Sequence, residues 1–179
     1  MQAQTSSTGA ANTPDPVIPA VEGEFYRYTT EFTMERPLGF LMDCKANKGR
    51  SVTDAADHPT EHDLTFLFGD TVGVCSPYAP PSIELLNELA VLDELHETRI
   101  ARVNMAPDAF STLRDNRSGQ TLVDVVRAAV PIFQAEQVFT LAPGLILAVM
   151  TDTHKFGLLR ILEVTPTSVS IEGIHILLP

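Results

Sequence analysis

Positive charge is scarce in this sequence. It contains 12 lysine and arginine residues against 23 aspartate and glutamate residues, which gives a formal net charge of -11 and a pI near 4.7. A field of this sign repels phosphate backbones and anionic lipid headgroups, so binding to nucleic acid or to a membrane surface is disfavoured. Neutral ligands, metal ions and cationic partners are easier to accommodate.

Long hydrophobic runs are also missing. The longest apolar stretches, residues 138–150 and 158–164, are interrupted or bordered by Pro143, Gly144 and Asp152. Neither reaches the roughly 20 apolar residues that a membrane-spanning helix needs. We therefore expect no transmembrane segment.

Residues 1–22 lack the basic and apolar regions of a signal peptide. Their alanine, glutamine, serine, threonine and proline content is typical of the segment that follows a cleavage site, and it offers too little apolar surface to offset the entropy of ordering. We predict a disordered N-terminal tether at 1–22 and a single α+β domain at 23–179. The tether favours a periplasmic or extracellular protein, with a cytoplasmic location as the alternative.

Cysteine is rare. Cys44 and Cys75 are the two present, and their separation fits no redox or zinc pattern built on closely spaced cysteines. In an oxidising compartment they could form one disulfide. Two buried thiols are the alternative.

Alternating apolar residues predict strands in the first part of the chain, and leucine spacing then predicts helices. Ser82 suits the cap of the first helix, Pro107 the first turn of the second, and Thr121 the start of a third that Pro131 ends. The predicted strands are 25–34, 40–45, 64–68 and 72–75.

The C-terminal part is predicted to be a meander of strands at 137–141, 145–151, 156–164 and 169–177, separated by short turns. In the last strand the apolar positions change phase at Gly173, which favours a β-bulge there, and His175 is expected to face solvent. The predicted fold is α+β: a curved, largely antiparallel sheet of seven or eight strands, either a partly open barrel or two layers. Two or three helices are inserted between the N-terminal strands and the meander.

Metal-ligating residue types concentrate in one polar segment. Asp57, His58, Glu61 and His62 form a candidate site for Zn or Ca, followed directly by Asp63. Pro59 disfavours the helix that would place both histidines on one face, so a solvated loop is the competing interpretation.

No motif for nucleophilic catalysis and no glycine-rich phosphate loop is present, so the sequence nominates no catalytic and no cofactor-binding residue. The turn that carries Asp152, His154 and Lys155 is a candidate ligand-contacting hairpin, although turn chemistry alone also explains it. We hypothesise an exported, non-enzymatic domain that binds an unknown partner protein or small-molecule ligand. The alternative is a divalent-metal-dependent hydrolase that uses the loop from Asp57 to Asp63. Whether the protein is an enzyme, and its oligomeric state, stay open.

Overall fold

Two antiparallel sheets form the body of the computed structural model, which describes residues 23–39, 49–55, 62–86, 95, 97–135, 137–152 and 155–178. The larger sheet has the strand order β1, β9, β8, β7, β5, and the smaller sheet has the order β2, β3, β4, β6. All pairings within both sheets are antiparallel. The mixed α+β class with open, largely antiparallel sheets is therefore confirmed.

The bounds of the elements are as follows. The larger sheet contains β1 (Glu24–Thr33), β5 (Thr98–Arg102), β7 (Ile146–Thr151), β8 (Lys155–Val164) and β9 (Ser168–Leu177). The smaller sheet contains β2 (Leu38–Gly39), β3 (Leu64–Leu67), β4 (Gly73–Cys75) and β6 (Phe139–Thr140). The helices are α1 (Val52–Ala55), α2 (Pro80–Leu86), α3 (Pro107–Asn116) and α4 (Gly119–Ala128), followed by a 3-10 turn at Val130–Ile132.

The order of elements matches the predicted plan. Helices α2, α3 and α4 lie between the N-terminal strands and the meander formed by β7, β8 and β9. Strand β5, between α2 and α3, is an addition that the sequence patterns did not indicate. None of the helices in the described ranges is both long and apolar enough to cross a membrane. The predicted tether at 1–22 and the whole of the predicted strand at 40–45 lie outside those ranges.

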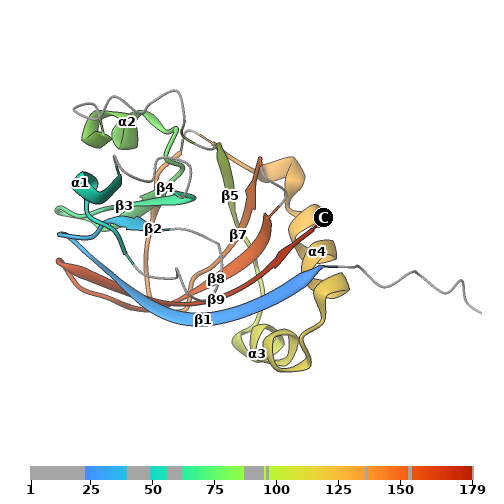
Figure 1. The fold of residues 1–179 in the computed structure, drawn as a ribbon. Helices are drawn as coiled ribbons and strands as arrows, with labels where there is room; N and C mark the ends of the chain where they lie inside the picture. The colour runs from blue at the N-terminus through green and yellow to red at the C-terminus, as the bar shows by residue number, and fades with distance from the viewer. Residues whose placement is uncertain are drawn as a thin grey trace, which may run out of the picture.

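The larger sheet is covered on both faces. Figure 1 shows it curving around the smaller sheet, with α3 and α4 on the opposite, convex side. The concave face packs Phe32, Leu159 and Ile171 against Phe66 and other residues of the smaller sheet. The convex face packs its own apolar residues against the two helices, among them Ile146, Leu158, Ile174, Phe110, Leu122 and Val126. Two separate cores result.

Strand β9 contributes to both cores, and this corrects the predicted bulge at Gly173. Val169 and Ile171 belong to the concave core, whereas Ile174 and Ile176 belong to the convex core. The pairing of β9 with β1 and with β8 runs without interruption through Gly173. The apolar phase changes because the two ends of the strand are covered on opposite faces. The irregularity in the meander lies in β8, where the register shifts between Ile161 and Glu163.

Gly173 is required for a different reason, which is space. It pairs with Tyr28 in β1, and a Cβ atom at 173 would overlap the tyrosine ring and lie 2.5 Å from its Oη. Because overpacking of a filled interior costs roughly 1–3 kcal/mol, we expect Gly173→Ala to lower the free energy of unfolding by that amount in urea titrations. Gly69→Ala is the matched control, since nothing lies within 4 Å of a Cβ atom there. Equal stability of the two variants would contradict the close approach.

Candidate functional site

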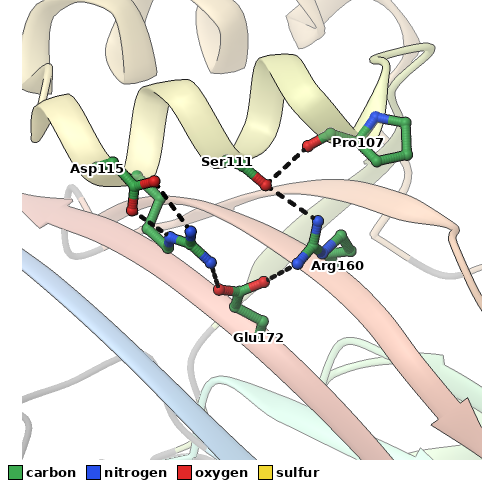
Figure 2. A network of polar contacts seen from close by, with 6 residues as sticks. Pro107, Ser111, Asp115, Arg160 and Glu172 are labelled. Carbon is green, nitrogen blue, oxygen red and sulfur yellow. Dashed lines mark hydrogen bonds and ion pairs between the residues drawn. The ribbon is translucent and has the colours of Figure 1, made fainter.

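Helix α3 is fixed to the convex face of the larger sheet by a charged network centred on Glu172 of β9. The Glu172 carboxylate forms ion pairs with Arg114 of α3 and with Arg160 of β8, and Figure 2 shows its contact with Arg160. Arg160 also donates to Ser111 Oγ at 3.3 Å, and Ser111 in turn donates to the carbonyl oxygen of Pro107 at 3.0 Å. The middle and the last turn of α3 are therefore tied to the sheet, which fixes the position of the exposed side of the helix.

An apolar groove lies where α3, α4 and the end of β5 meet. It has a volume of about 500 Å³. Its walls come from the β5–α3 connection, from one side of each helix and from the 3-10 turn, and we call it the α3–α4 groove. The lining residues are Arg102, Val103, Asn104, Met105, Ala106, Ala109, Val125, Ala128, Ala129 and Ile132.

The local sequence explains why this groove stays open. Pro107 begins α3 directly after the connection, and Pro131 lies in the 3-10 turn that ends α4, so both helices have a defined end beside the groove. The alanines at 106, 109 and 128 carry too little side chain to fill the space between the helices. Ile132 remains 57% exposed beside them. The result is apolar surface that the described part of the chain leaves uncovered.

A second notable feature is a buried polar cluster on the concave face of the larger sheet. Lys155 of β8 and Asp63, just before β3, are separated by 92 positions, yet Lys155 Nζ lies 3.0 Å and 2.9 Å from the two carboxylate oxygens of Asp63. Their side chains are 3% and 0% exposed. The Asp63 N–H donates to the carbonyl oxygen of Gly39 at 2.9 Å, which holds the aspartate against β2. This ion pair therefore connects the two sheets.

His175 lies in the same cluster and is fully buried, so the prediction that it faces solvent is wrong. Its ring stacks on Tyr26 at a centroid distance of 4.9 Å and meets Tyr28 edge-on at 5.6 Å. Neither ring nitrogen has a hydrogen-bond partner among the described residues. Burial, and then the Lys155 ammonium, lower the pKa of His175 to about 4. The imidazole is therefore neutral at neutral pH.

The cluster contains one ion pair and two neutral rings. Burial and the Asp63 carboxylate raise the pKa of Tyr28, so the phenol is also neutral. One ammonium thus faces one carboxylate, with a neutral imidazole and a neutral phenol beside them. An arrangement of this kind fixes how two layers pack, because any other register would separate the buried charges.

The structure describes some of the site residues nominated from the sequence, and others lie outside the described ranges. Cys44, Asp57, His58, Glu61 and His154 lie outside the described residues, so the metal site and the disulfide stay predictions. His62 and Cys75 are both buried. In the ranges that the structure describes, no group of three or more histidine, cysteine, aspartate or glutamate side chains is arranged to hold a metal ion.

Asp152 and Lys155, two residues of the predicted ligand-contacting hairpin, lie in different surroundings. Asp152 is exposed and lines a surface cavity of about 360 Å³ together with Glu97, Arg99 and Phe156. Lys155 points instead into the protein toward Asp63. Asp152 and Lys155 therefore do not contribute to one site, and the Lys155 side chain is not exposed at the tip of the turn.

Comparison with known proteins adds information on the fold. No protein-family model and no curated protein matches the sequence. The structure is similar to that of a DUF4466 family protein from Parabacteroides merdae, with a TM-score of 0.53 and 12% sequence identity over 86% of this chain and 54% of that one. The chain thus spans about half the length of that protein. At this identity the likeness concerns the fold, and it agrees with the α+β architecture.

Proposed function

We propose that this chain is a non-enzymatic binding domain that takes a small apolar ligand in the α3–α4 groove. The groove itself is the observation that carries the proposal. Its volume of about 500 Å³ falls within the range of roughly 300–1,000 Å³ typical of small-molecule sites, which are also mainly apolar. The export to the periplasm or cell exterior that the composition of residues 1–22 favours is part of the same proposal.

The chemistry of the lining supports binding over catalysis. Arg102 and Asn104 are the polar side chains among the described lining residues. Neither side chain is a usual nucleophile or general base at neutral pH. The ionisable residues of the concave cluster lie on the other face of the larger sheet, where Lys155 is held by Asp63 and His175 is fully buried.

Binding can be tested with the neutral, apolar fluorescent probe N-phenyl-1-naphthylamine, whose emission rises in apolar surroundings. We expect saturable binding to the wild-type protein. Ala109→Phe places an aromatic ring in the groove from an exposed position of α3, so the affinity for the probe should fall by about tenfold or more, equivalent to about 1.4 kcal/mol.

The matched control is Thr112→Phe, which adds the same ring at an exposed position of the same helix that does not line the groove. Its affinity for the probe should equal that of the wild type. Absence of saturable probe binding, or equal affinity of the Ala109→Phe variant, would rule out the groove as the binding site.

A further inference from the structure

We propose that the ligand of the α3–α4 groove is a fatty carboxylate, with its apolar chain between the helices and its carboxylate on Arg102. This inference rests on the function proposed above and names its ligand class. Arg102 is the charged side chain among the described residues that line the groove, and it stands at the rim, at the end of β5. Every other lining residue except Asn104 is apolar. The α3–α4 groove therefore combines one cationic side chain with a mainly apolar lining.

Most N–H donors of the Arg102 guanidinium make no hydrogen bond to the described residues. Within the described ranges it makes one hydrogen bond, from Nη2 to the carbonyl oxygen of Thr140 at 3.4 Å, which is at the long end of hydrogen-bond distances. The arginines of the convex network differ, since Arg114 and Arg160 are both held by the Glu172 carboxylate. An arginine has five N–H donors and binds a carboxylate through two parallel hydrogen bonds. A carboxylate at the rim would supply the acceptors that the protein does not.

The net charge of the chain favours a ligand with one negative charge over a ligand with several. A net charge of -11 repels polyanions such as nucleotides, and a single arginine cannot offset that field. A monoanion requires one counter-charge, which Arg102 provides. An apolar cation is disfavoured because the arginine would repel it at the rim. A monocarboxylate with an apolar body fits both the Arg102 side chain and the apolar lining of the α3–α4 groove.

The discriminating experiment displaces N-phenyl-1-naphthylamine with decanoate or with decan-1-ol, at neutral pH and at concentrations below micelle formation. The two molecules share the same chain and differ in the head group. We expect decanoate to displace the probe from the wild-type protein at about tenfold lower concentration than decan-1-ol, because it adds an ion pair with charge-assisted hydrogen bonds.

Arg102→Gln should abolish the preference for decanoate, measured within each variant as the ratio of the concentrations at which decan-1-ol and decanoate displace the probe, and Arg102→Lys should restore part of it. Arg99→Gln is the control. It removes the same charge from the same strand at a position that does not line the groove, so the preference should remain.

The outcomes separate this inference from the function on which it rests. If the probe does not bind at all, the proposed function fails. If the probe binds and the acid and the alcohol displace it equally well, the groove stands and the carboxylate assignment is overturned. A preference for decanoate that survives in Arg102→Gln would overturn the role of Arg102.

Discussion

Replacing Lys155 with methionine should lower the free energy of unfolding by about 3–5 kcal/mol, one of the largest effects that we expect from a single substitution in this protein. The substitution keeps a long apolar stem but removes the ammonium that faces the Asp63 carboxylate, whose side chain is 0% exposed. Lys155 Nζ contacts both oxygens of that carboxylate, at 3.0 Å and 2.9 Å, so the whole interaction is lost at once. Urea-induced unfolding near neutral pH measures the change.

Two further variants give this prediction its control. Removing both charges, in Lys155→Met with Asp63→Leu, should recover most of the lost stability, because neither charge of the pair is then left buried without the other. Arg99→Met breaks an exposed pair with Glu97, whose side chains are 52% and 40% exposed, and should cost less than about 1 kcal/mol. If Lys155→Met were as mild as Arg99→Met, the buried pair would not hold the sheets together.

The recovery expected in the double variant bears on why the pair exists. Two well-packed apolar side chains often stabilise a fold about as well as a buried ion pair, so we infer that this pair serves to select one register between the sheets. Asp63 reaches Lys155 from the segment that leads into β3, and Gly39 of β2 accepts its N–H. The pair thus links the smaller sheet to the meander that ends the chain.

Local chemistry explains the elements that the sequence predicted well. Proline has the backbone angle of the first helical turn, so the helix predicted to begin at Pro107 corresponds to α3 at Pro107–Asn116. The turn before β9 is closed by Thr165 Oγ1, which accepts the Ser168 N–H at 2.9 Å. The predicted strand at 169–177 accordingly agrees with Ser168–Leu177. Such signals involve residues that are close in the chain.

The features that were missed depend on residues that are distant in the chain. If one face of the strand at 169–177 is buried, the alternation predicts that His175 faces solvent, because it is out of phase with Ile174 and Ile176. Its face is covered by other strands, so it is buried as well. Lys155 was assigned to the tip of a turn because nothing near it in sequence indicates a carboxylate 92 positions away.

The α3–α4 groove could not be found from single residues either. Ala106, Ala109 and Ala128 are ordinary residues for helices and their ends, and an alanine is equally common where a neighbouring side chain fills the space. An empty volume is a property of how α3, α4 and the end of β5 are placed. The placement of α3 involves the Glu172 network, whose members come from three separate elements, α3, β8 and β9.

His175 should make the fold sensitive to mild acid. Its pKa is lowered from 6.5 to about 4 in the folded protein, by burial and by the Lys155 ammonium. Above pH 6.5 the imidazole is neutral in both the folded and the unfolded chain, so it adds no pH dependence. Below that pH the unfolded chain binds a proton that the folded chain excludes, and stability falls with decreasing pH until about pH 4. The full loss across this window is about 3 kcal/mol, because each pKa unit corresponds to about 1.4 kcal/mol.

The free energy of unfolding, measured in urea at several pH values between 6.5 and 4, should therefore decline more steeply for the wild type than for His175→Phe. Carboxylates titrate in the lower part of this range in both proteins, so the difference between the two slopes isolates the histidine. Phenylalanine keeps an aromatic ring against Tyr26 and Tyr28 and removes two buried nitrogens that have no partner in the described ranges. Because the slope is compared and not the absolute stability, a packing change in the variant does not obscure the result. Parallel slopes would mean that the imidazole can bind a proton in the folded state, and that the ring does not lie buried beside Lys155.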